Sequence, residues 1–121
     1  GRQLVVQAQP LWLQGEPLLL RALLDNLLDN ALRHARQQVT CRLQAEHGEL
    51  LLEVSDDGPG LQLEAGQDPF APFVQGLGFS GQAGLGLAIV GAVARQHGGT
   101  ASCQPAARGG LQISIRLPLA P

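Results

Sequence analysis

The sequence contains no lysine, because all eight of its basic residues are arginines. A P-loop nucleotide site requires a lysine directly after the second glycine of its Walker A motif, so this class of NTPase is excluded. Tyrosine and methionine are also absent, and there is a single tryptophan. Hydrophobic residues still make up 45% of the chain, so a core can form, but it must be built from aliphatic side chains.

The net charge is small, long apolar runs are absent, and there are only two cysteines. The net charge of −2 at pH 7 predicts no nucleic-acid partner. No apolar run approaches the roughly 20 residues that a membrane-spanning helix needs. Cys41 and Cys103 lie far apart in alternating segments, without a C-x-x-C pair. We therefore expect two reduced strand residues rather than a disulfide or a metal site.

The 121 residues suggest one domain, residues 1–121, whose hydrophobic pattern alternates between strand and helix periods. Leucines and alanines at i, i+3 and i+4 spacing predict a helix over residues 18–36, and a second helix is predicted over residues 85–96. Alternating or apolar segments predict strands at 3–8, 39–45, 50–54, 100–104 and 111–117, with a further candidate strand at 11–13.

This order of elements predicts the fold class. Helices that interrupt mostly antiparallel strands indicate an α+β two-layer sandwich, with a mixed, mostly antiparallel sheet covered on one face by helices. Residues 55–84 are rich in Gly, Pro and Gln and have no sustained periodicity. Loops of this length are uncommon in compact domains and are often functional.

The first helix carries a polar stripe beside its apolar face. Asn26, Asn30 and His34 are spaced by four residues, and Arg33 is adjacent to them. An asparagine oxygen can ligate Mg²⁺, and arginine can pair with phosphate oxygens. Asparagines at a helix border are more often solvated or capping, so the stripe alone leaves both interpretations open.

Two glycine-containing segments suggest further ligand contacts. DDGPG at residues 56–60 follows a strand and is ordinary turn sequence, but a carboxylate fixed there could accept a hydrogen bond from an exocyclic amine. GLGLAIV at residues 84–90 opens the second helix with glycines, which leaves backbone N–H groups open to an anion. By contrast, the G-x-G-x-x-G match at residues 76–81 has no preceding strand and no acidic residue after it, which excludes a dinucleotide fingerprint.

Together these segments resemble the histidine-kinase branch of the GHKL ATP-binding superfamily, over nearly the whole chain. LDNLLDNA at residues 24–31 looks like the N box of that family, and DDGPG looks like its G1 box. FAPF at residues 70–73 is similar to the F box, GLGLAIV to the G2 box, and HGGT at 97–100 to the turn after the last helix. Each box is modest support alone, but their order and spacing together are specific.

The resemblance implies a Bergerat-type sandwich that binds ATP and Mg²⁺ between its helices, under a lid at about residues 61–83. Asn30 would ligate the metal, Asn26 would line the same cleft, and Arg33 would meet phosphate. His34 would lie beside the nucleotide, and Asp56 would receive the adenine amine. The remaining nucleotide-binding positions implied by the resemblance are Gly58 and Gly60 under the ring, and Gly84, Leu85, Gly86 and Leu87 at the phosphates.

The sequence departs from related proteins at three points that bear on activity. Gln82 stands where the G2 box usually has glycine, and the lid has no lysine to contact the γ-phosphate. ATPases of the gyrase and MutL kind carry a glutamate base one turn before the metal-ligating asparagine, where this chain has Asn26. An amide cannot remove a proton from water, so we expect slow hydrolysis.

The resemblance also implies partners. None of the three histidines lies in an acceptor-type helix, so the chain should bind ATP without phosphorylating itself. The acceptor would lie on the dimerisation and histidine-phosphotransfer domain of the same kinase, and an aspartate of a response-regulator receiver domain would take the phosphoryl group next. The full-length protein would be a homodimeric inner-membrane sensor with this domain in the cytoplasm. Another ATP-binding member of the superfamily, or an interaction module without nucleotide, are the alternatives.

Overall fold

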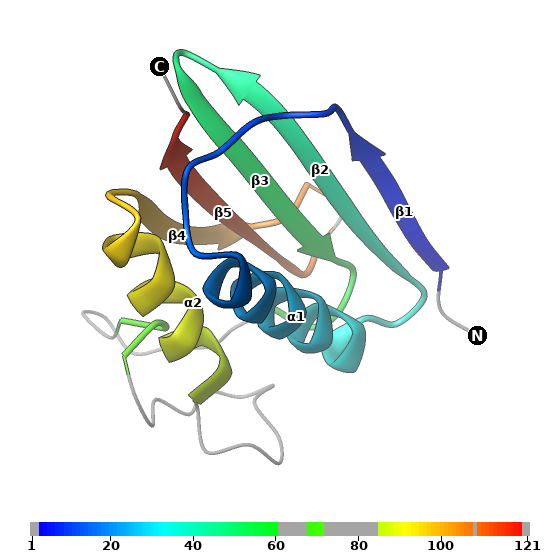
Figure 1. Cartoon of the computed structure of the whole chain (residues 1–121). Coiled ribbons are helices and arrows are strands. Elements are labelled where there is room, and N and C mark those ends of the chain that lie inside the picture. The colour runs from blue at the N-terminus through cyan, green and yellow to red at the C-terminus, as the bar shows by residue number, and fades with distance from the viewer. Residues whose placement is uncertain (1–2, 61–67, 72–84, 108, 120–121) are drawn as a thin grey trace.

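Two helices pack on one face of a sheet, and the other face of the sheet is open (Figure 1). The computed structural model describes residues 3–60, 68–71, 85–107 and 109–119. Within these residues the strands are β1 (Gln3–Ala8), β2 (Gln38–Glu46), β3 (Glu49–Asp56), β4 (Thr100–Pro105) and β5 (Leu111–Pro118), and the helices are α1 (Pro17–His34) and α2 (Leu85–Gln96).

The strands lie in the order β1-β2-β3-β5-β4. β1 runs parallel to β2, and every other neighbouring pair is antiparallel. The prediction of a mixed, mostly antiparallel sheet with helices on one face is therefore confirmed. The β2–β3 hairpin turns at His47 and Gly48, whose φ angles of 54° and 78° suit the right-handed twist of the strands.

The core lies between the sheet and the helices and is aliphatic, as predicted. β5 shows the alternation clearly, because Leu111, Ile113, Ile115 and Leu117 are buried while the intervening residues are not. From the helices, the buried residues include Leu23, Leu27 and Ala31 of α1 and Leu87, Val90, Val93 and Ala94 of α2. Among the described residues Phe70 is the aromatic member of this core.

Two sequence expectations differ from the structure. Residues 11–13 form no strand; Leu11 and Leu13 pack against the core while Trp12 is 89% exposed, so their alternation reflects a chain that covers the edge of the core. The first helix ends at His34, not at residue 36. The Ala35 N–H still donates to the carbonyl oxygen of Ala31, but the N–H groups of Arg36 and Gln37 donate to the carboxylate of Asp57, the residue after β3, instead of continuing the helix.

Cys41 and Cys103 lie in strands, as predicted, on β2 and β4, and both are free thiols. Across the described residues, neither helix has the length and apolar character needed to cross a bilayer.

Candidate functional site

Asn26, the first residue of the polar stripe of α1, faces the first turn of α2. Asn26 and Asn30 are half-buried. Asn26 Nδ2 donates to the carbonyl oxygen of Ala22 at 2.7 Å, which fixes the carboxamide on the helix. Its Oδ1 lies 3.2 Å from the position that a Cβ on Gly86 would occupy. Asn26 and the predicted phosphate-binding Gly86 therefore lie side by side.

The other end of the stripe meets the turn that follows β3. A Cβ on Gly58 would lie 2.1 Å from the carbonyl oxygen of His34, closer than any real contact. Only glycine allows the turn to approach the last residue of α1 this closely. The structure thus brings the DDGPG turn against the same helix whose middle faces α2. Because Asn26, Asn30 and His34 are spaced by four residues on α1, the predicted residues follow one another in a row along this helix, from Gly86 at one end to Gly58 at the other.

Asp56 is the acid at the end of this row, and it is only 6% exposed. Its Oδ1 accepts hydrogen bonds from the backbone N–H groups of Gly58, at 2.9 Å, and Leu111, at 3.4 Å. Burial raises the pKa of Asp56, while these two hydrogen bonds and the nearby His34 oppose that shift. The carboxyl is therefore held in one orientation, in a poorly solvated environment.

His34 shares the environment of Asp56. Burial lowers the pKa of His34, and the charge of Asp56 opposes the shift while Arg33 adds to it. A pKa below the ordinary value for histidine leaves the ring neutral at pH 7. The end of the site that holds Asp56 thus presents a carboxyl and a neutral imidazole, which suits a heterocyclic base better than a second anion.

Arg33 has a partner within its own helix. Its guanidinium forms an ion pair with Asp29 one turn earlier. Asp29 is four residues before Arg33, so the two side chains lie on the same face of the helix. The phosphate contact predicted for Arg33 would have to share the guanidinium with that carboxylate.

Sequence reasoning missed the role of Asp57. Its carboxylate accepts hydrogen bonds from the backbone N–H groups of Arg36, Gln37 and Gln38, at 2.7 to 3.2 Å. These hydrogen bonds lower the pKa of Asp57, the one from Gln37 most. Asp57 thereby ties the turn after α1 to the end of β3. Asp56 and Asp57 therefore have different roles, and in the sequence the only signal of this was that two aspartates stand side by side.

Two glycines complete the surroundings of Asp56. Gly110, with φ of 85°, lies so close that a Cβ there would be 2.1 Å from the carbonyl oxygen of Asp56. Gly60 has φ of 80°, and a Cβ there would lie 3.4 Å from the carbonyl oxygen of Gly110. The β4–β5 turn is therefore part of the site. In the sequence the signal for this contact was the pair Gly109-Gly110, but Asp56, which Gly110 contacts, is 54 positions away.

The remaining predicted positions fall into two groups. Leu85 is the first residue of α2, and Leu87 is 2% exposed in the core, so a nucleotide could reach Leu87 only at its backbone. Phe70 of the F-box-like segment packs on α2, where a Cβ on Gly91 would lie 2.9 Å from its Cβ. Gly84, Gln82, the glycine motif at 76–81 and the lid at 61–83, apart from residues 68–71, lie outside the described residues.

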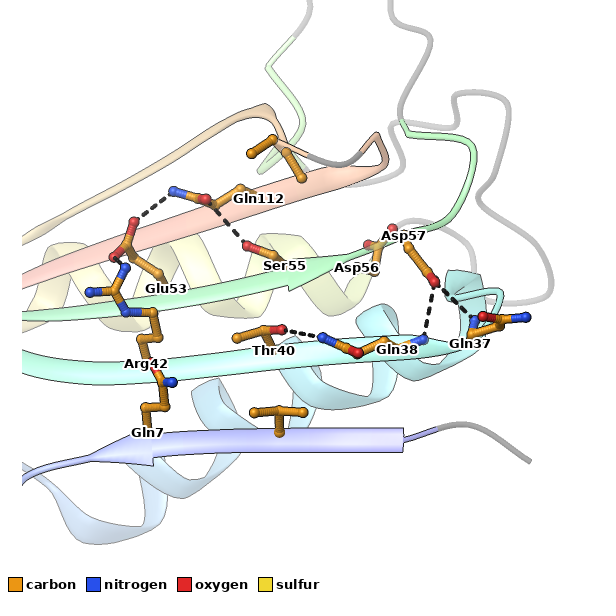
Figure 2. A pocket seen from close by; sticks show the side chains of 13 residues that line it. Gln7, Gln37, Gln38, Thr40, Arg42, Glu53, Ser55, Asp56, Asp57 and Gln112 are labelled. Carbon is orange, nitrogen blue, oxygen red and sulfur yellow. Dashed lines mark hydrogen bonds and ion pairs between the residues drawn. The ribbon is translucent and has the colours of Figure 1, made fainter.

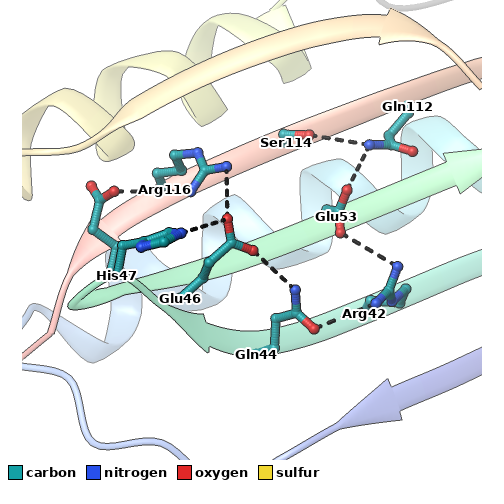
Figure 3. A network of polar contacts seen from close by, with 9 residues as sticks. Arg42, Gln44, Glu46, His47, Glu53, Gln112, Ser114 and Arg116 are labelled. Carbon is teal, nitrogen blue, oxygen red and sulfur yellow. Dashed lines mark hydrogen bonds and ion pairs between the residues drawn. The ribbon is translucent and has the colours of Figure 1, made fainter.

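A hollow of about 540 Å³ lies on the open face of the sheet, opposite the helices, and extends to Asp56 and Asp57 at the end of β3 (Figure 2). Polar side chains of β2, β3 and β5 line it, and they bind one another. Glu53 receives a hydrogen bond from Gln112 at 2.7 Å and pairs with Arg42 at 3.8 Å. The same face continues into a second set of ion pairs, in which Arg116 contacts Glu46 at 3.5 Å (Figure 3). We interpret this face as solvated sheet surface, since its charges are already paired.

Comparison with known proteins agrees with this geometry. Residues 15–121 match the family described as "Histidine kinase-, DNA gyrase B-, and HSP90-like ATPase". The chain is 42% identical over 107 residues to the sensor histidine kinase GtrS of Pseudomonas aeruginosa, covering 86% of this chain and 22% of that protein. It is 35% identical over 125 residues to the sensor histidine kinase CpxA of Escherichia coli K12, covering 98% of this chain and 27% of that one.

Solved structures share the fold. The mycobacterial sensor histidine kinase MprB has a TM-score of 0.86 at 31% identity, over 98% of this chain and 83% of that one. Full-length ShkA, crystallised in complex with AMPPNP, has a TM-score of 0.83 at 28% identity, over 99% of this chain and 26% of that one. The chain spans about a quarter of the length of the curated relatives named above. It belongs to the histidine kinase-, DNA gyrase B- and HSP90-like ATPase family, and within it to the ATP-binding catalytic domains of sensor histidine kinases.

Proposed function

We propose that this domain binds Mg-ATP along the row from Asp56 to Gly86 and donates the γ-phosphoryl group to a histidine on a separate domain of the same kinase. The observation that carries the proposal is the continuity of that row. The buried acid lies at one end and the glycine-opened N-terminus of α2 at the other, with two asparagines between them. This arrangement matches a ligand with a base at one end and phosphates at the other.

At the Asp56 end we assign the adenine ring. Asp56 Oδ1 is occupied by two backbone N–H groups, so we assign Oδ2 as the acceptor for the exocyclic amine of adenine. The neutral His34 ring lies beside this position, and Gly58 allows the turn to sit close to the helix. A carboxylate acceptor selects a base with an amino group over one with a carbonyl group at the same position.

At the α2 end we assign the phosphates and their metal. The described residues contain no cluster of three or more His, Cys, Asp or Glu side chains that could hold an ion. A single Asn30 oxygen nonetheless fits Mg²⁺, because this ion commonly takes one or two protein oxygens and completes its shell with phosphate and water. When bound, Mg²⁺ would neutralise phosphate charge. The backbone N–H groups at the start of α2 would bind phosphate oxygens.

The histidines of the chain support an external phosphoryl acceptor. His34 lies inside the row, next to Asp56. His47 lies in the β2–β3 turn, on the opposite end of the sheet from the row, and the ring of His97 hydrogen-bonds at both nitrogens. We therefore infer that a dimerisation and histidine-phosphotransfer domain supplies the acceptor. A receiver-domain aspartate then takes the group, within a homodimeric membrane sensor whose catalytic domains are cytoplasmic.

The test is calorimetric titration of AMPPNP with Mg²⁺ into the wild-type chain and Asn30→Ala. We expect the substitution to weaken binding by roughly tenfold or more, because removal even of groups that merely orient a metal ligand has effects of that size. The difference should vanish when EDTA removes the metal. Asp25→Ala is the matched control, since Asp25 lies on the exposed side of the same helix, paired with Arg21. Equal and negligible binding in wild type and Asn30→Ala would favour a module that binds no nucleotide.

Phosphoryl transfer is tested with γ-labelled ATP. The domain alone should acquire no label and release phosphate slowly, because Asn26 cannot act as a base. Adding the histidine-bearing domain of the same kinase should transfer label to that domain. Rapid hydrolysis by the isolated chain would assign it to the ATPase branch of the family instead.

A further inference from the structure

The ring of His97 joins the start of α1 to the residue after α2, at the end of the helix pair farthest from the proposed phosphate site. His97 follows the last residue of α2, and its Nδ1 lies 2.9 Å from the carbonyl oxygen of Val93. Its Nε2 accepts a hydrogen bond from the backbone N–H of Glu16 at 3.1 Å, across 81 positions of sequence. Since Nε2 accepts, Nδ1 carries the proton and donates to Val93. The ring is therefore neutral, in one tautomer.

The backbone of α1 needs this acceptor. Glu16 is the N-cap of α1, and its side chain makes no capping hydrogen bond. Backbone N–H groups at the start of a helix have no partner within the helix. His97, directly after α2, supplies a partner for one of them, and so caps a helix to which it does not belong.

The surrounding glycines fit this contact closely. A Cβ on Gly15 would lie 2.6 Å from Cδ2 of the His97 ring, so the ring packs directly on the backbone before α1. After the ring, Gly98 adopts φ of 75°, and the Gly99 N–H donates to the carbonyl oxygen of Ala94 at 2.8 Å. This glycine end of the helix fixes where the His97 side chain begins.

The contact matters to the site because the helices touch again where the first turn of α2 meets the middle of α1. Asn26 and Gly86 lie there, 10 residues along α1 from Glu16 and 11 residues along α2 from His97, which is roughly 15 Å in each helix. The clearance at that end is small, because Asn26 Oδ1 lies 3.2 Å from where a Cβ on Gly86 would be. A change of angle at the His97 end therefore changes the space between the asparagines and the α2 N-terminus.

We propose that His97 is a positioning residue for nucleotide binding: its imidazole sets the spacing of α1 and α2, and through it the geometry of the phosphate end of the site. The proposal rests on the nucleotide site proposed above. It differs from a purely stabilising cap in one respect. Breaking the Glu16 contact should weaken nucleotide binding in protein that is still fully folded.

Two carboxamide variants separate the two hydrogen bonds of the ring. In His97→Gln the longer side chain places an oxygen near the position of Nε2, so it can still accept from Glu16. In His97→Asn the shorter carboxamide reaches only the Nδ1 position, so the bond to Val93 survives and the link between the helices is lost. Gln96→Ala, at the neighbouring exposed position, is the control.

The experiment measures the dissociation constant of AMPPNP with Mg²⁺ well below the melting temperature, and the melting temperature itself. We expect His97→Asn to raise the dissociation constant roughly threefold to tenfold, the effect of one lost hydrogen bond. The dissociation constant of His97→Gln should stay within about twofold of the wild-type value, and that of Gln96→Ala should equal the wild-type value. A lower melting temperature with unchanged binding in His97→Asn would overturn the proposal and leave only a capping role.

A measurement without nucleotide keeps this test distinct from that of the proposed function. Nitrogen NMR of the free domain should show the Nδ1–H tautomer of His97, and the Glu16 amide should exchange faster with solvent in His97→Asn than in His97→Gln. If wild type shows these signals but binds no nucleotide, the proposed function fails while the helix link stands. If the Glu16 amide exchanges at the same rate in all variants, the link itself is refuted.

Discussion

Replacing Asp56 by asparagine should separate nucleotide binding from stability. The substitution keeps the size of the side chain, and its amide oxygen can still accept from the N–H groups of Gly58 and Leu111 that now bind Oδ1. The atom assigned to the adenine amine changes from a carboxylate oxygen to an NH₂ group. A donor then faces a donor, and the charge that assisted the hydrogen bond is gone.

The size of the binding loss follows from the kind of bond removed. A hydrogen bond to a charged group contributes about 1.5–3 kcal/mol, which corresponds to roughly 10-fold to 100-fold in the dissociation constant. Asp56 is 6% exposed, so little water is available to replace the lost partner. We therefore expect the upper part of this range for ATP. A 6-oxopurine nucleotide should lose less, because its carbonyl oxygen can accept from the new NH₂ group.

The free domain should respond in the opposite direction. Burial raises the pKa of Asp56, so the folded state binds its proton more tightly than the unfolded chain, where the pKa is about 3.9. The corresponding stability is present below the unfolded pKa and is lost as pH rises through the folded pKa. At pH 7 the buried charge thus destabilises the fold. Asp56→Asn removes that charge, so its melting temperature at pH 7 should equal or exceed that of wild type.

Titration calorimetry with AMPPNP and Mg²⁺, paired with thermal unfolding of the free domain, tests both halves. The reasoning is refuted if Asp56→Asn binds AMPPNP as tightly as wild type does. A large drop in the melting temperature of the free variant would refute the account of its buried charge, and would mean that the weaker binding reflects damage to the fold.

Two further substitutions test the turn after β3. Gly58→Ala places a Cβ 2.1 Å from the His34 carbonyl oxygen, so the turn must move away from α1. We expect the free energy of unfolding in urea to fall by about 1–3 kcal/mol and AMPPNP binding to weaken. Pro59→Ala, at the neighbouring exposed position, should change neither quantity. Asp57→Asn removes a carboxylate whose pKa is lowered by backbone N–H donors. The stability that this carboxylate contributes to the folded state is present above the pKa of the unfolded chain, and it is lost as the pH falls through the lower pKa of the folded state. Melting temperatures between about pH 2 and pH 6 should therefore depend less on pH in Asp57→Asn, and an acid limb as steep as that of wild type would contradict the role given to these hydrogen bonds.

The sequence predicted the order of the elements and most of their bounds, because helix and strand periods are local properties. The leucine spacing of α1 and the alternation of β5 each follow from which face must be buried. The candidate site was also visible as a set of residues, since the asparagine stripe, the DDGPG turn and the glycine-opened helix are each short motifs. That they face one another was an expectation, and the contacts of Gly58 and Gly86 with α1 support it.

Tertiary structure decided the features that depend on partners distant in the chain. α1 ends at His34, and the backbone amides of Arg36 and Gln37 donate to the Asp57 carboxylate instead of to the helix, which helix propensity alone could not reveal. The link between His97 and Glu16 crosses 81 positions, and the fit of Gly110 against Asp56 crosses 54. The period of the apolar residues predicts a helix or a strand, because it shows which face of the element is buried. The atom that each polar group binds is selected only when folding brings separate elements within hydrogen-bonding distance.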